Sequence, residues 1–196
     1  IKREFKDKKG IATLLGNLGT VAKTQGDYVQ TRKIYEESLS VFREIGDKKG
    51  IADFLNNLGD LAGIQRDYVK AKKFYEDSLP VFRDIGDKQG IASSLNNLGN
   101  LVNLSGDYEQ AKKFIKESLV IFREIGDKHG VASSISNLGR AALSQREYEP
   151  AKKYLKECLD IQLEIGDKNG IADSLNYMGN VAFGLTDFKK AIILMN

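Results

Sequence analysis

Residues 47–86 read DKKGIADFLNNLGDLAGIQRDYVKAKKFYEDSLPVFRDIG, and this stretch returns along the chain with a period of 40 residues. Its opening pattern, Asp-Lys-x-Gly followed by Ile or Val and then Ala, begins at Asp7, Asp47, Asp87, Asp127 and Asp167. A Leu-Gly or Met-Gly pair keeps the same register, with its glycine at Gly19, Gly59, Gly99, Gly139 and Gly179. A third marker is an aromatic residue near the start of the second predicted helix of each repeat, at Tyr28, Tyr68, Tyr108, Tyr148 and Phe188. Three markers in one register, without insertions, indicate a repeat protein of the solenoid type.

Each repeat predicts two helices. Asp47 is placed to cap the first, because its carboxylate can accept hydrogen bonds from the free N–H groups of the first turn. Apolar residues then recur at helical spacing, at Ile51, Leu55, Leu58 and Ala62. Asp67 precedes a second helical series of Ala71, Tyr75, Ser78, Phe82 and Ile85. The alternation typical of β-strands is missing from the sequence, so the predicted fold class is all-α.

Glycines mark the predicted helix ends, where a left-handed residue is tolerated best. Those that end second helices are Gly46, Gly86, Gly126 and Gly166. Gly26 and Gly106 take the same place after first helices, whereas Arg66, Arg146 and Thr186 replace that glycine in the other repeats.

The register divides residues 1–196 into one array of about four and a half repeats. Full repeats are predicted at 7–46, 47–86, 87–126 and 127–166, with a truncated repeat at 167–196. Residues 1–6 match the last turn of a preceding second helix. Residues 187–196 are expected to begin another second helix, and either to fray or to be buried against another molecule. Because neither helix of a repeat can bury its apolar stripe alone, neighbouring repeats should cover one another.

The repeat resembles the tetratricopeptide family, in which an aromatic or Leu, then Leu-Gly, two small residues and an aromatic recur. The matching residues in the second repeat are Leu55, Leu58, Gly59, Ala62, Ala71 and Tyr75. The usual repeat is 34 residues long, so this chain is similar to the long-repeat branch that includes kinesin light chain and the Leu-Gly-Asn repeat adaptors. Leu98-Gly99-Asn100 spells that tripeptide. The resemblance implies a right-handed superhelical solenoid of antiparallel helix pairs.

The resemblance also implies a non-catalytic scaffold that binds a peptide or protein along a concave face lined by the first helices. The positions that it assigns to this face lie just before and just after each Leu-Gly or Met-Gly pair. They are Asn17, Asn56, Asn57, Asn96, Asn97, Asn100, Asn137, Arg140, Asn176, Tyr177 and Asn180. A carboxamide both donates and accepts, so it can pair with an extended peptide backbone whatever the peptide's side chains.

A purely structural role for these asparagines stays open. Duplication would copy an asparagine that bonds a neighbouring backbone into every repeat, without any ligand. Two other functions also remain: self-assembly through stacked array ends, with a second copy as partner, and nucleic-acid binding along basic pairs such as Lys72-Lys73. Acidic residues four positions further on make the nucleic-acid partner unlikely, because they can neutralise these lysines.

The composition argues against several classes of partner and site. The 30 basic and 27 acidic residues are spread evenly and leave a net charge of +3, so nucleic acid and anionic membranes are not favoured. No apolar run reaches the ~20 residues of a membrane span. One histidine and one cysteine, Cys158, cannot make a metal cluster or an internal disulfide. We therefore expect no cofactor, no enzyme activity and a cytoplasmic location, for a chain that begins with Ile1 and is read as a fragment.

Overall fold

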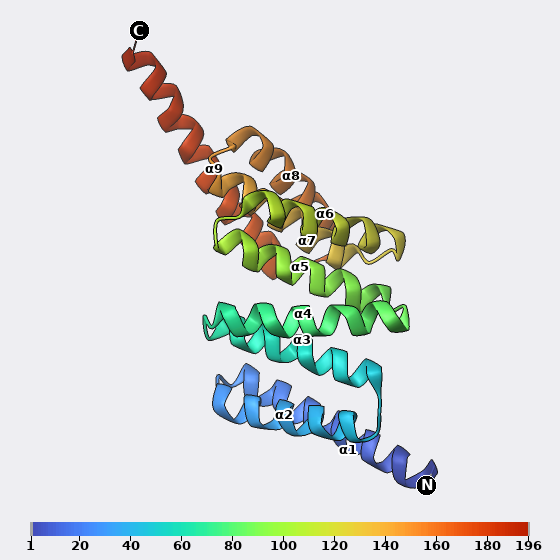
Figure 1. The fold of residues 1–196 in the computed structure, drawn as a ribbon. Coiled ribbons are helices and arrows are strands. Elements are labelled where there is room, and N and C mark those ends of the chain that lie inside the picture. Colours follow the sequence, from blue (N-terminus) through green and yellow to red (C-terminus); the bar gives the residue numbers. More distant parts are fainter. Residues whose placement is uncertain (1, 196) are drawn as a thin grey trace. The chain divides into compact units, whose positions relative to one another are not determined.

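The computed structural model describes the backbone of residues 2–195 and the side chains of residues 7–186, and all of its regular elements in this range are α-helices (Figure 1). The chain forms two compact units, Ile1–Leu101 and Val102–Asn196. The predicted all-α class is confirmed.

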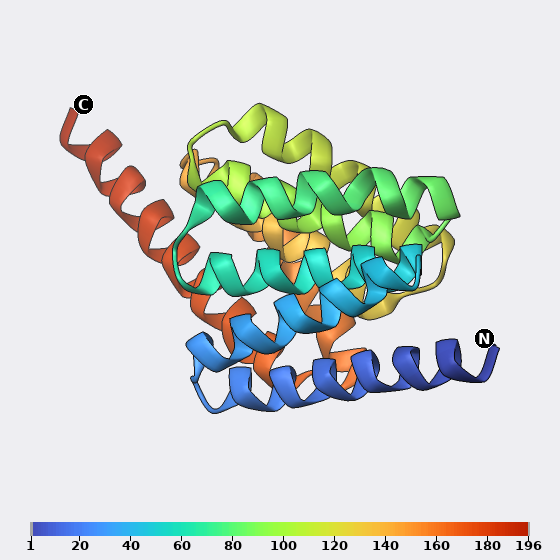
Figure 2. The same cartoon turned by 60° about the horizontal axis from the view of Figure 1, so that its bottom comes forward.

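The first unit holds five helices within the described range: α1 (Lys2–Thr24), α2 (Tyr28–Glu44), α3 (Lys48–Ile64), α4 (Tyr68–Ile85) and α5 (Lys88–Leu104), whose last turn runs into the second unit. Figures 1 and 2 show α1 with α2, and α3 with α4, as antiparallel hairpins joined by short turns. The hairpins stack because α2 packs on α3. Their core contains Tyr35, Phe42, Phe54 and Leu58, all buried.

The second unit continues the pattern with α6 (Tyr108–Glu124), α7 (Lys128–Ser144), α8 (Tyr148–Ile165) and α9 (Lys168–Met195). Helix α7 packs against both α6 and α8, and α8 packs against α9. Ile115, Ile135 and Leu138 form one buried cluster, and Leu155 and Val181 belong to another. Odd-numbered helices are thus the first helices of the repeats, and even-numbered helices are the second.

The Asp-Lys-x-Gly pattern lies at the start of the first helices α3, α5, α7 and α9, and α3 shows what each of its residues contributes. Asp47 caps α3, since its Oδ1 accepts a hydrogen bond from the Gly50 N–H at 3.0 Å. Lys48 forms an ion pair with Asp84 at the end of α4, which closes the hairpin. A Cβ at position 50 would collide with the ring of Phe42 on α2, so only glycine lets that ring lie on the start of α3. Gly90 with Phe82 and Gly130 with Phe122 repeat the arrangement.

The predicted left-handed residues are confirmed. Gly26 and Gly106 have φ of 79° and 87° after α1 and α5. Arg66 and Arg146 adopt the same region, with φ of 60° and 59°, although a side chain makes it unfavourable. The turn between the paired helices therefore forms even where glycine is lost.

Two predicted helix boundaries are wrong. Helix α1 runs unbroken from Lys2 past Asp7, and α9 runs from Lys168 to Met195 with no break before Phe188. Lys6 and Thr186 occupy the places of the turn glycines, and a β-branched residue such as threonine is rare in the left-handed region. The Thr186 hydroxyl instead donates to the Ala182 carbonyl at 2.9 Å and continues the helix. The expected fraying concerns side chains of residues 187–196, outside the described range.

We predict that a side chain at the glycine of the Leu-Gly pair destabilises the fold wherever a second-helix ring packs on that glycine, as at Gly59. An added Cβ at Gly59 would lie 2.5 Å from Tyr75 Cε1, which is held between α3 and α4. We expect Gly59→Ala to lower the free energy of unfolding by about 1–3 kcal/mol through overpacking. Urea unfolding followed by circular dichroism measures this change.

Gly63 on the same helix gives the matched control, because no atom lies within 4 Å of its added Cβ. Gly63→Ala should stabilise the chain by about 0.5–1 kcal/mol, since alanine is the better helix former. Equal effects of the two substitutions would show that the contact with Tyr75 is not the constraint.

Candidate functional site

A groove lies in the first unit over α1, α3 and the start of α5. Its volume is ≈ 380 Å³, and most of its lining comes from the first helices. The lining residues are Thr13, Gly16, Asn17, Thr20, Lys49, Asp53, Phe54, Asn56, Asn57, Phe82, Gln89, Gly90 and Ser93. The groove therefore brings together Asn17, Asn56 and Asn57 of the predicted site.

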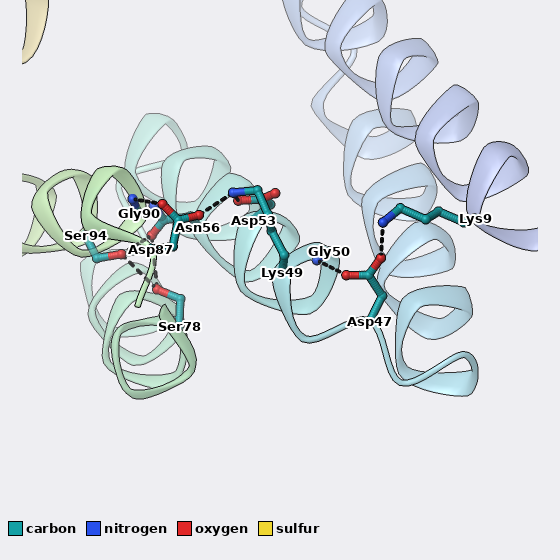
Figure 3. A network of polar contacts seen from close by, with 10 residues as sticks. All are labelled: Lys9, Asp47, Lys49, Gly50, Asp53, Asn56, Ser78, Asp87, Gly90 and Ser94. Carbon is teal, nitrogen blue, oxygen red and sulfur yellow. Dashed lines mark hydrogen bonds and ion pairs between the residues drawn. The ribbon is translucent and has the colours of Figure 1, made fainter. Parts of the chain in front are cut away.

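Asn56 points inward. Its Oδ1 accepts hydrogen bonds from Ser78 Oγ at 3.1 Å and from Ser94 Oγ at 3.0 Å, and it links α3 to α4 and α5 (Figure 3). Both serines are buried. The carbonyl oxygen of Asn56 is thus bonded within the protein, to serine side chains rather than to backbone.

Asn97 is also held by the chain. Its Nδ2 donates to Asp60 Oδ1 at 3.0 Å, and the same oxygen accepts from the Tyr75 hydroxyl at 2.7 Å. In the first repeat, Thr20 and Tyr35 form the equivalent contact at 3.1 Å. In these two repeats the residue after the Leu-Gly pair therefore bonds the tyrosine hydroxyl of the second helix.

Asn17 and Asn57 behave differently. Asn17 is exposed and Asn57 is half-buried, and both line the groove. Among the residues whose side chains are described, neither amide has a hydrogen-bond partner. These two side chains keep both their donors and their acceptors available.

Lys49 and Asp53 line the groove and belong to a series of charged contacts beside it. Lys9 on α1 binds Asp47 at 2.6 Å, and Lys49 on α3 binds Asp87, so each lysine reaches the aspartate that caps the next first helix (Figure 3). Burial alone would raise the pKa of Asp87, but hydrogen bonds from Lys49 and Gly90 hold it below the usual value. Burial raises the pKa of Asp53, although Lys49, 3.7 Å away, acts against it.

Sequence reasoning missed this link, because the residue at this position varies among the repeats, as Lys9, Lys49, Gln89, His129 and Asn169. The available signal was the recurrence of lysine at positions 9 and 49, each 38 residues before a capping aspartate.

A second groove lies within the second unit, with a volume of ≈ 340 Å³. It brings together Asn137, Arg140 and Tyr177 of the predicted site with residues of α7 and α9 such as His129 and Asp173. The remaining predicted residues line neither groove. Asn96 is buried, Asn100 is half-buried, and Asn176 and Asn180 are exposed.

Comparison with known families settles the class of protein. The family model described as Tetratricopeptide repeat matches residues 10–84 and 90–164, most of the sequence. The chain belongs to the tetratricopeptide repeat family. No match was found among the curated proteins.

Solved structures share the tetratricopeptide fold at low identity. BtubC (BKLC) from P. vanneervenii is 21% identical, with a TM-score of 0.76 over 98% of this chain and 84% of that one. RapI in its apo form is 18% identical, with a TM-score of 0.77 over 93% and 66%. A Rap protein complexed with Competence and Sporulation Factor is 13% identical, with a TM-score of 0.80 over 92% of this chain and 50% of that one. These likenesses establish the fold, and this tetratricopeptide chain spans only half of the last protein.

The described part of this tetratricopeptide chain has neither a membrane span nor a metal site. None of its helices is long and apolar enough to cross a bilayer. No group of His, Cys, Asp and Glu side chains in that part could hold a metal ion.

Asp60 predicts a pH effect on stability. Burial raises the pKa of this carboxyl above its usual value, against the opposing hydrogen bond from Tyr75. A carboxyl with a raised folded-state pKa stabilises fully below its unfolded pKa, and this contribution is lost as the pH rises through the folded pKa. Asp60→Asn, which can keep both accepted hydrogen bonds, should therefore raise the melting temperature at pH 7 more than at pH 3.5.

Asp77→Asn removes an exposed carboxylate from α4 and serves as the control in the same thermal scans. A gain that is constant across this pH range, or a loss at pH 7, would contradict the assigned role of burial at Asp60.

Proposed function

We propose that the chain is a peptide- or protein-binding scaffold that takes an extended segment of its partner along the first helices α1, α3 and α5. The observation that carries the proposal is the pair of groove amides, Asn17 and Asn57, which are accessible and not bonded within the described part. They come from adjacent first helices. An extended backbone that follows the groove would therefore meet one amide after another.

The chemistry of the amides suits this ligand. Each carboxamide can donate to a peptide carbonyl and accept from a peptide N–H, so two of them bind backbone without reading side chains. Selectivity would then come from the groups beside them, Lys49, Asp53 and the ring of Phe54. The tetratricopeptide fold is typical of protein-interaction scaffolds, which agrees with this assignment.

We assign no catalytic role to the groove. The carboxylate in its lining, Asp53, is paired with Lys49 at 3.7 Å, and the nearby Asp47 and Asp87 are used as helix caps and as partners of Lys9 and Lys49. One solved relative is named Aspartyl phosphate phosphatase F from Bacillus subtilis, but 12% identity conveys the fold alone.

A random-peptide display selection tests the function without a named partner. The wild-type chain should select peptides, and Asn17→Ala/Asn57→Ala should bind those peptides about tenfold more weakly, since each lost hydrogen bond contributes ~0.5–1.5 kcal/mol. Fluorescence polarisation with labelled peptides measures the affinities.

Lys72→Ala/Lys73→Ala, on the exposed face of α4, is the matched control and should bind like the wild type. Circular dichroism verifies that both variants fold. Unchanged affinity in the asparagine variant would remove the groove from the proposal, and a loss in the lysine variant would favour the basic face instead.

A second candidate function, self-association through α1, is favoured by an exposed apolar stripe. Ile11, Leu14, Leu18 and Val21 are 52–65% exposed. Their counterparts in the next repeat include Phe54, Leu58 and Leu61, which α2 and its neighbours bury to 8% exposure or less. A second copy that covers the stripe would bury the same kind of surface.

Light scattering distinguishes this candidate from the first. If α1 mediates self-association, the wild-type chain has the mass of a dimer and Leu14→Lys/Leu18→Lys returns it to a monomer, because two charges cannot be buried unpaired there. A monomeric wild type at micromolar concentration would reject the candidate and leave peptide binding unaffected.

A further inference from the structure

Arg140, on α7 in the second unit, is held in place without being neutralised. Its guanidinium carbon lies 5.5 Å from the centroid of the Tyr177 ring, and its Nη1 donates to Asn137 Oδ1 at 3.3 Å. The three side chains line the same groove. Within the part of the chain whose side chains are described, no carboxylate forms an ion pair with Arg140.

The contact with the Tyr177 ring and the hydrogen bond to Asn137 together restrict the guanidinium. A cation over an aromatic face loses rotational freedom before any ligand arrives. Arginine has five N–H donors, and the bond to Asn137 uses one of them. The planar guanidinium can therefore still bind a carboxylate through two parallel hydrogen bonds.

The architecture of the repeat does not require a cation at this position. The equivalent residue in the second repeat is Asp60, which is satisfied by the Tyr75 hydroxyl and by Asn97. Thr20 and Asn100 occupy the same position in the first and third repeats.

In the fourth repeat, both residues that would bond the side chain at position 140 differ from those that bond Asp60. Leu155 replaces the second-helix tyrosine, and Tyr177 replaces the asparagine of the following first helix. A carboxylate at position 140 would thus lose both donors that serve Asp60. The ring of Tyr177 instead offers a face on which a guanidinium can stack.

We propose that Arg140 binds the carboxylate of an aspartate or glutamate side chain in the partner segment. This inference rests on the proposed function and names the chemistry of the peptide that the second groove takes. The other charged groups around the groove set a limit. Asp167 caps α9 by accepting from the Gly170 N–H at 3.0 Å, and Asp173 is exposed on the same lining. Two carboxylates there oppose an acidic run, so the segment carries one acidic residue at this point.

The test is a display selection with unphosphorylated random peptides on the full chain and on Arg140→Ala. Peptides selected by the wild type should share one Asp or Glu at a fixed place in their alignment, and those selected by Arg140→Ala should not. For a single synthetic peptide, Arg140→Ala should weaken binding at least about tenfold, because a charge-assisted hydrogen bond contributes ~1.5–3 kcal/mol.

A double-mutant cycle then identifies the contact. Replacing the peptide's Glu by Gln should weaken binding to the wild type to a similar degree, and should have little further effect on Arg140→Ala. Arg123→Ala removes an exposed arginine that is paired with Glu157 at 3.0 Å, and it should change neither affinity nor sequence preference.

The outcomes separate this inference from the proposed function. Selected peptides without acidic enrichment, or independent effects in the cycle, would overturn the role of Arg140 and leave peptide binding in place. If neither protein selects peptides while both give helical circular dichroism spectra, the proposed function falls and this inference falls with it.

Discussion

An aromatic ring that lies directly on a glycine is the contact on which the stacking of this chain depends. Phe42 lies on Gly50 between successive hairpins, and Tyr75 lies on Gly59 within a hairpin. Both contacts bring a second helix close to a first helix, and an added methyl group at either glycine would force the ring to move. The capping aspartates and the lysine ion pairs depend on this close packing, because they connect residues that lie near one another only when the helices approach closely.

The repeated backbone leaves the residue after each Leu-Gly pair free to differ. Thr20 and Asp60 bond the tyrosine hydroxyl of their second helix, whereas in the fourth repeat a leucine replaces that tyrosine and Arg140 contacts the ring of Tyr177. The same backbone position therefore holds a hydrogen-bonded acid in one repeat and a cation without an ion-pair partner among the described side chains in another. The residue that fits after the Leu-Gly pair therefore depends on its partner in the second helix, because a tyrosine there offers a hydroxyl to bond and a leucine does not.

The sequence was sufficient for the helices, their caps and the left-handed turns, because those features depend on spacing and on single residues such as Asp47 and Gly26. It was insufficient where two tendencies compete. Loss of the turn glycine at Arg66 leaves the turn intact, whereas loss at Thr186 lets the helix continue. The asparagines divide for a similar reason: Asn56 and Asn57 are neighbours in sequence, yet ~100° of helical rotation separates them, and only Asn56 meets two serines.

Some asparagines, such as Asn56, are bonded within the protein, whereas others, such as Asn57, are not, and this difference limits which side chains can contact a ligand. An amide that bonds within the protein cannot also read a ligand, so the side chains available for recognition are those that the packing leaves aside. In the first unit these are the amides of Asn17 and Asn57, which would bind a peptide backbone under the proposed function. In the second unit the guanidinium of Arg140 would add the preference for an acidic residue that we propose. Under these two proposals, general affinity and sequence preference would come from different repeats.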